Sequence, residues 1–135
     1  MELITWTNDF SVGVTEIDNQ HQKLVKMINE LHQAMKKGKG NSYVENIIKQ
    51  LIDYSIYHFE TEEKYFDKFN YPESKSHKEI HKKFINDISV FKDDFENKKI
   101  MLTLDVLNFL SNWLREHILG VDMDYSDFLI DNGLK

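Results

Sequence analysis

The chain has 135 residues, enough for one domain with a hydrophobic core, and a formal net charge of −6 at pH 7. Its lysines are interspersed with Asp and Glu, and no basic face or arm is visible, so we expect no nucleic-acid partner. The absence of cysteine excludes disulfides, thiolate metal ligands and a cysteine nucleophile. The N-terminus lacks a signal-peptide pattern and no segment is apolar enough to span a membrane, so we expect a soluble cytoplasmic protein without a membrane partner.

Five glycines and a single proline allow few turns, which favours long helices over a fold of many strands. Residues 1–14 carry large apolar side chains without a helical period, and we expect them to form an ordered arm across the helices. Thr15 and Asp18 resemble a capping box, and the apolar seam that follows predicts a first helix over roughly 16–37. That seam consists of Ile17, His21, Leu24, Ile28, Leu31 and Met35.

Ser42 and Glu45 form a capping box at the start of a second helix, predicted over roughly 43–70. This helix ends before Pro72 because the residue that precedes a proline avoids helical geometry. Its seam consists of Val44, Ile48, Leu51, Ser55, His58, Glu62, Tyr65 and Phe69. Pro72 suits the first turn of a third helix, predicted over roughly 73–96. The third seam consists of His77, His81, Phe84, Ile88, Phe91 and Phe95.

Thr103 is the expected cap of a fourth helix over roughly 103–119, which Gly120 ends. The fourth seam consists of Val106, Leu110, Trp113 and His117. Residues 123–131 are a candidate for a short closing helix. Four amphipathic helices joined by short turns predict an all-α fold: a single domain over 1–135, built as an antiparallel up-down-up-down four-helix bundle with an N-terminal arm.

Every one of the four seams contains histidine, and one of them also contains a glutamate. His58 and Glu62 lie four residues apart, as do His77 and His81, so each pair presents two side chains on one helical face. In an antiparallel bundle, the starts of the first and third helices share an end with the finishes of the second and fourth. We therefore expect seven polar residues to converge at one end of the core. They are His21, His58, Glu62, His77, His81, His117 and Asp122.

Whether Asp122 reaches this site depends on the path of the chain after the fourth helix. Asp122 follows His117 by five residues, too far round a helix to share its face, and it reaches the site if the chain turns at Gly120. Each motif by itself is more typical of a core histidine or a helical contact, but their matching depth in four seams indicates a shared site. His32 lies off the seam and is expected at the surface.

Five histidines and two carboxylates are too many ligands for one ion and suit two. If Glu62 and Asp122 bridge both ions together with one solvent-derived oxygen, three histidines complete six-coordination on one ion. The other two leave the second ion with one open position, which suits a small diatomic ligand. Imidazole and carboxylate ligands fit iron, and the lack of thiolates argues against a soft metal. The apolar residues within a turn of a ligand, either simple core or a dry pocket, are Leu24, Phe59, Trp113, Leu114 and Ile118.

Four motifs together resemble the hemerythrin family, and specifically its single-domain bacterial members. The first is W-x(n)-S-V-G-V-x-x-I-D-x-Q-H, which ends at His21, and the second is H-F-x-x-E from His58 to Glu62. The others are H-x-x-x-H, which ends at His81, and H-I-x-x-x-D, which ends at Asp122. The resemblance covers essentially the whole chain and fills all seven ligand positions.

The resemblance implies a non-haem centre of two iron ions, bridged by Glu62, Asp122 and an oxo or hydroxo group. It places the three histidines His77, His81 and His117 on the coordinatively saturated iron. His21 and His58 would hold the iron with the open position, where members of the family bind dioxygen reversibly. The apolar residues above match the family's oxygen pocket, and Tyr125 matches a position that is usually aromatic. Gln20 is a candidate hydrogen-bond partner for a ligand, by its position alone.

The function expected from this reading is dioxygen storage, transport or delivery, without enzymatic activity and with an unknown protein partner. A di-iron oxidase or ferroxidase is the first alternative, but such sites favour paired Glu-x-x-His motifs, and none occurs in the sequence. An oxygen or redox sensor, in which the N-terminal arm responds to ligand binding, is the second alternative.

Overall fold

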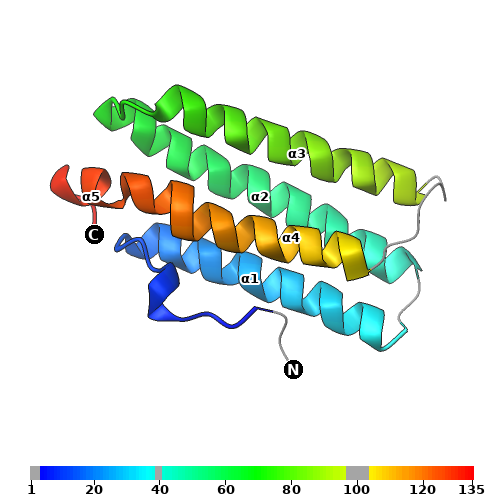
Figure 1. The fold of residues 1–135 in the computed structure, drawn as a ribbon. Coiled ribbons are helices and arrows are strands. Elements are labelled where there is room, and N and C mark those ends of the chain that lie inside the picture. The colour runs from blue at the N-terminus through cyan, green and yellow to red at the C-terminus, as the bar shows by residue number, and fades with distance from the viewer. Residues whose placement is uncertain (1–3, 39–40, 97–103) are drawn as a thin grey trace.

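The computed structural model describes residues 4–38, 41–96 and 104–135, which form four long helices packed side by side (Figure 1). The elements are η1 (Asn8–Phe10), α1 (Thr15–Lys36), α2 (Asn41–Phe69), α3 (Ser74–Glu96), α4 (Leu104–Glu116), η2 (His117–Asp122) and α5 (Met123–Asp131). Successive long helices run in opposite directions, α1 packs on α2 and α4, and α2 packs on α3. The described residues contain no strand. The all-α antiparallel bundle, with its arm and closing helix, is confirmed.

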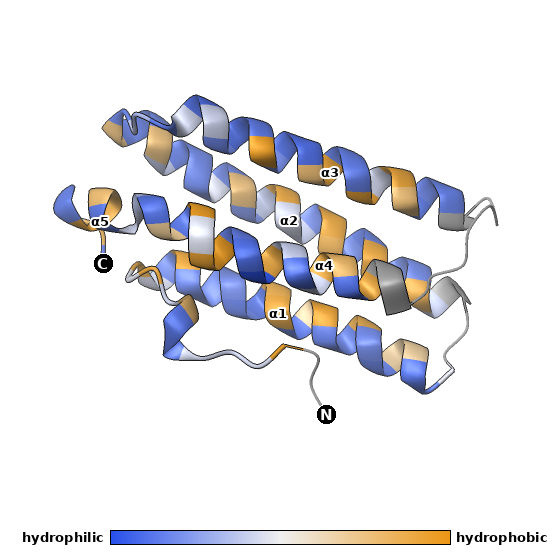
Figure 2. Cartoon of the chain, in the orientation of Figure 1, coloured by the Kyte–Doolittle hydropathy of each residue, from blue (hydrophilic) through white to orange (hydrophobic). Residues whose placement is uncertain are grey.

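Hydrophobic and hydrophilic positions alternate around each long helix, and the hydrophobic ones turn inward to form the core (Figure 2). The end of the α2 seam differs from the prediction. Tyr65 and Phe69 are only half-buried, whereas Phe66 is fully buried. Its ring packs 5.3 Å from that of Tyr125 on α5. The seam shifts here because α5 covers the end of the bundle and buries the neighbouring face of α2.

The N-terminal arm is tied to the bundle by both apolar and polar contacts. Ile4 is buried, and its backbone N–H and C=O bond to the Asn29 side chain at 2.9 and 2.8 Å. The capping box predicted at Thr15 is wrong: α1 starts from Val14 without a side-chain cap. The Asp18 carboxylate instead accepts hydrogen bonds from the arm, namely the Ser11 hydroxyl and the backbone N–H of the next residue. Asp18 therefore fastens the arm to the helix instead of capping it.

The chain does not turn at Gly120, which corrects the expected path after α4. It continues as a π-helix over His117–Asp122 and then directly as α5. A π-helix pairs residues five apart, so its turn is wider than that of an α-helix. His117 and Asp122, five residues apart, therefore come onto the same side of the chain.

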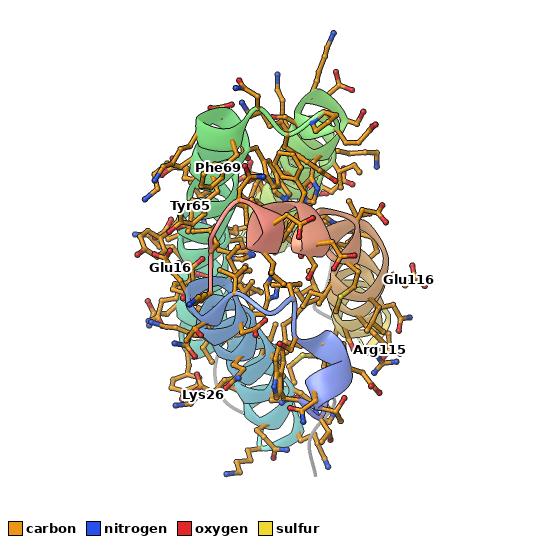
Figure 3. The ribbon with its side chains drawn as sticks, turned by 90° about the vertical axis from the view of Figure 1, so that its left-hand side faces the viewer. Glu16, Lys26, Tyr65, Phe69, Arg115 and Glu116 are labelled. Carbon is orange, nitrogen blue, oxygen red and sulfur yellow. The ribbon has the colours of Figure 1, made fainter. Side chains whose placement is uncertain are left out.

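α5 lies across the end of the bundle at which α1 and α3 begin (Figure 3). Tyr125 and Leu129 of α5 are fully buried there against an apolar cluster of the arm and the helix ends. The expected caps at Ser42 and Thr103 and the seam positions Phe95 and Val106 lie outside the described side chains. None of the described helices is long and apolar enough to cross a membrane.

Candidate metal centre

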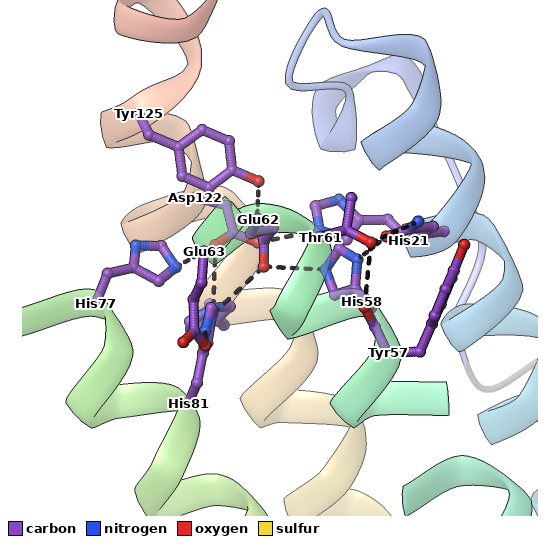
Figure 4. A network of polar contacts seen from close by, with 12 residues as sticks. His21, Tyr57, His58, Thr61, Glu62, Glu63, His77, His81, Asp122 and Tyr125 are labelled. Atoms are coloured by element: carbon purple, nitrogen blue, oxygen red, sulfur yellow. Dashed lines mark hydrogen bonds and ion pairs between the residues drawn. The ribbon is translucent and has the colours of Figure 1, made fainter. Parts of the chain in front are cut away.

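The structure brings together all seven predicted ligand residues, under the end that α5 covers (Figure 4). They come from α1, α2, α3 and η2, and each is at most 5% exposed. The residues are His21, His58, Glu62, His77, His81, His117 and Asp122. His32, expected at the surface, is half-buried and belongs to neither ligand group of this cluster.

Asp122 lies at the meeting point of three helices. Its Oδ2 atom is 3.1 Å from His21 Nε2, and its Oδ1 atom is 3.0 Å from Nε2 of both His77 and His117. The wide turn of η2 brings this carboxylate back over His117. The same side chain therefore faces one histidine on α1 and two on the opposite side of the core.

Glu62 occupies the corresponding position on α2. Its Oε1 atom lies 3.1 Å from His58 Nε2 and 3.3 Å from His81 Nε2, and its Oε2 atom accepts a hydrogen bond from the Tyr125 hydroxyl. Each carboxylate thus touches histidines from both sides of the site. Tyr125, singled out from the sequence, anchors one of them from α5.

The ligand atoms form two groups, and within each group they all lie within 4.8 Å of one another. One group joins three histidines, His77, His81 and His117, with both carboxylates. The other joins His21 and His58 with the same two carboxylates. Two cation positions that share Glu62 and Asp122 fit this arrangement, with three histidines on one side and two on the other.

A set of buried polar atoms in the cluster has no hydrogen-bond partner, and metal ligation would satisfy them. They are Nε2 of His21, His77, His81 and His117, Oε1 of Glu62 and both carboxylate oxygens of Asp122. Buried atoms of this kind are rare in folded proteins, and each costs roughly 1–3 kcal/mol when left unsatisfied. Because these atoms face one another and offer only imidazole and carboxylate donors, the site is suited to binding metal cations.

Both carboxyl groups are held in the charged form. Burial by itself raises the pKa of Asp122, but the charge of His117 and contacts with the other histidines outweigh it and place the pKa well below its usual range. Burial and Asp122 likewise raise the pKa of Glu62, and His58 and His81 outweigh them, so its pKa is also lowered. Two buried negative charges therefore attract cations to the centre.

The histidines differ in how firmly they hold a proton. Burial lowers the pKa of His58, which keeps its imidazole neutral and available as a ligand. Burial also opposes the charge on His81, but its contacts with Glu62 and Glu63 outweigh burial and raise its pKa to about 9. Metal binding by His81 would therefore require loss of a proton from its imidazole.

Two ligand histidines have a protein partner on their outer nitrogen. His58 Nδ1 lies 2.6 Å from Gln20 Oε1, and the Gln20 amide donates a hydrogen bond of 3.2 Å to Thr61. His81 Nδ1 lies 3.0 Å from Glu63 Oε2. Gln20 was named from the sequence, whereas Thr61 and Glu63 were missed. Glu63 directly follows a ligand, but only the packing of α2 on α3 brings it to His81.

A small apolar cavity of about 10 Å³ lies beside the centre, one helical turn deeper in the bundle. Four of the five predicted pocket residues line it: Leu24, Phe59, Trp113 and Leu114. Ile118 is fully buried but is not part of the lining. The rest of the cavity wall was not predicted from the sequence, although its residues lie on the same helical seams. These residues are Ile28, Leu51, Ser55, Phe84 and Leu110.

Aromatic rings cover the ligands on the cavity side. Phe59 stacks on His81 with a centroid distance of 3.8 Å, and Trp113 stacks on His117 at 4.4 Å. The Ser55 hydroxyl in the cavity wall donates its hydrogen bond to the Leu51 carbonyl of its own helix. The space beside the ligands is therefore dry and apolar.

The fold is a four-helix bundle, and its core contains a cluster of histidines and carboxylates able to hold metal. These two features are those of a metal-binding helical bundle protein. The family model for the hemerythrin HHE cation binding domain matches residues 12–129. The chain belongs to the hemerythrin family.

Known relatives are similar over most of the chain. The bacteriohemerythrin of Pseudomonas aeruginosa (strain PAO1) is 35% identical over 127 residues, which cover 94% of this chain and 82% of that protein. A hemerythrin-like protein of Naegleria gruberi is 35% identical over 124 residues, which cover 92% of each chain. A solved structure of wild-type hemerythrin matches with a TM-score of 0.87 and 32% identity, covering 94% of this chain and 98% of that one.

Proposed function

We propose that this protein binds dioxygen reversibly at a non-haem di-iron centre, for storage, transport or delivery. The observation that carries the proposal is the pair of ligand groups that share two carboxylates beside a dry cavity. His77, His81 and His117 would hold one iron, and His21 and His58 the other. Glu62 and Asp122 would bridge them. Bound iron would supply the redox-active metal to which a small diatomic ligand binds.

The side chains of the protein would hold the cations and exclude water from the centre. The two carboxylates that both groups share would hold two cations close together, and the histidines that would bind them are buried in the core. Leu24, Leu114 and the rings of Phe59 and Trp113 exclude water from the space beside the histidines of the centre. By excluding water and protons, this apolar wall would slow irreversible oxidation of an iron centre held there and so favour reversible binding.

The same wall argues for binding over catalysis. Among the described residues that line the cavity, none is titratable, so no side chain there is placed to donate a proton for cleavage of the O–O bond. The Tyr125 hydroxyl donates its hydrogen bond to Glu62. Burial raises the pKa of Tyr125 well above its ordinary value, so the proton stays on the phenol.

An absorption experiment tests the proposal directly. The iron-loaded protein is reduced without air, exposed to air, and then returned to an anaerobic atmosphere while its visible spectrum is recorded. We expect a colourless form that becomes coloured in air and bleaches again when dioxygen is removed. A colour that develops once and never reverses contradicts reversible binding and favours an oxidase or a sensor instead.

A further inference from the structure

His81 lies between two carboxylates of adjacent residues on α2. Its Nε2 atom faces Glu62 Oε1 at 3.3 Å, and its Nδ1 atom faces Glu63 Oε2 at 3.0 Å (Figure 4). Glu62 is fully buried, whereas the Glu63 side chain is 29% exposed. The outer nitrogen of this ligand therefore donates its proton to a charged group at the edge of the core.

The other four histidines of the centre lack such a partner. The outer nitrogen of His58 meets the neutral amide of Gln20, and that of His21 is buried without any hydrogen bond. In the described part of the chain, no carboxylate pairs with the outer nitrogen of His77 or His117. Glu63 thus places a single extra negative charge beside the three-histidine group, and the two-histidine group has only a neutral counterpart.

A carboxylate that accepts the outer N–H of a metal-bound histidine fixes the ring and makes the imidazole more basic. A more basic ligand, with a negative charge behind it, stabilises the more highly charged state of the metal. We propose that Glu63 is a positioning residue that acts through His81 and makes the three-histidine position the more easily oxidised half of the centre. This inference rests on the proposed di-iron site, but not on the reversibility of dioxygen binding.

Two matched variants test the inference. Glu63→Gln keeps the size and an acceptor oxygen but removes the charge beside His81. Glu60→Gln makes the same change on α2 at an exposed position that belongs to neither ligand group. The reduction potential of the iron-loaded proteins is measured by a mediated redox titration followed by visible absorption, and iron affinity by competition with a chelator.

We expect Glu63→Gln to raise the reduction potential and to weaken iron binding by about tenfold to a hundredfold, the usual cost of losing such a partner. Glu60→Gln should match the wild type in both quantities. A Glu63→Gln protein with the wild-type potential overturns the inference, even if its unfolding temperature falls, because that result marks a purely structural contact.

Failure of the inference can be told apart from failure of the proposed function. An iron-loaded wild type that does not release dioxygen reversibly contradicts the proposed function. In that case a raised potential in Glu63→Gln still supports the role of Glu63.

Discussion

At the scale of single residues, the centre is defined by buried polar atoms that the protein itself does not satisfy. Nε2 of four histidines and three carboxylate oxygens have no hydrogen-bond partner although they are buried. In a purely structural core, such atoms would lower the free energy of unfolding, and sequences with apolar residues there would be more stable. Their concentration at one point indicates a site that is completed by cations.

His58 tests the ligand assignment because it belongs to the two-histidine group alone. His58→Ala should lower the iron content per chain or abolish the coloured oxygenated form, since only His21 would remain beside the shared carboxylates. Iron analysis after gel filtration, together with the spectrum in air, measures both quantities. His32→Ala is the control, because His32 belongs to neither ligand group. Wild-type iron content and an unchanged oxygenated spectrum in His58→Ala would refute the assignment.

Leu114 tests the role of the dry cavity. Leu114→Ala opens the wall beside the centre, so water reaches the bound ligand and autoxidation should become faster. The rate is followed as the decay of the oxygenated spectrum. Leu107→Ala removes the same atoms from α4 at a buried position outside the cavity wall, and it should keep the wild-type rate. Both variants lose about 2–5 kcal/mol of stability, so a difference between their rates belongs to the cavity. An unchanged rate in Leu114→Ala removes this residue from the pocket.

At the scale of elements, η2 decides whether Asp122 can join the centre. Five residues separate Asp122 from His117, and an α-helix would place them on different faces. The π-helical turn instead brings the Asp122 carboxylate within 3.0 Å of His117 Nε2. The same continuous helix leads into α5, which carries Tyr125 to the other carboxylate. The π-helical turn therefore positions both the Asp122 carboxylate and the Tyr125 hydroxyl that binds Glu62.

Gly120 is not needed as a turn residue in this arrangement. It lies within η2, and a Cβ atom added there would meet nothing within 4 Å. Gly120→Ala should therefore raise the free energy of unfolding by about 0.5–1 kcal/mol through a lower entropy of the unfolded chain, without a change in iron content. Denaturant unfolding of the iron-loaded protein provides the measurement. A clear loss of stability or of iron would show that the turn depends on glycine after all.

Gly13→Ala is the matched control, and it should do the opposite. Gly13 has a φ of +78°, and a Cβ atom there would lie 2.7 Å from Cδ1 of Ile130. The Ile130 side chain can move aside, but the left-handed backbone conformation costs about 1–2 kcal/mol for a residue with a side chain. We therefore expect Gly13→Ala to be less stable than the wild type.

At the scale of the whole molecule, the polar centre separates two apolar clusters. One fills the long middle of the bundle, and the other joins the arm, the end of α2 and α5. Ile17 and Phe66 lie on the outer side of the ligands, and Leu24 and Phe59 on the inner side. The stability of the bundle therefore depends on whether the buried polar atoms between these two clusters have binding partners.

Removal of the metal tests this dependence. The metal-free protein should unfold at a lower temperature than the iron-loaded protein, because cations that bind only the folded state stabilise it. Circular dichroism during heating, before and after treatment with a chelator, measures the difference, and added ferrous iron under anaerobic conditions should restore it. Equal unfolding temperatures would mean that the bundle does not rely on metal in this layer.

The sequence by itself determined the helices and the set of polar residues on their inner faces. Spacings of three and four residues are a local property, and they place His21, His58 and His77 on core-facing seams whatever the partners are. The antiparallel order of the helices then follows from short connections, and it already predicts convergence at one end.

Tertiary structure alone decided the contacts between residues that are distant in the chain. Asp18 bonds to the arm and does not cap α1, and Phe66 is buried in place of Tyr65 because α5 folds over the bundle end. Glu63 reaches His81 only through the packing of α2 on α3. Such contacts depend on the rotation and axial position of packed helices and on the wide turn of η2. No local spacing along the chain encodes those quantities.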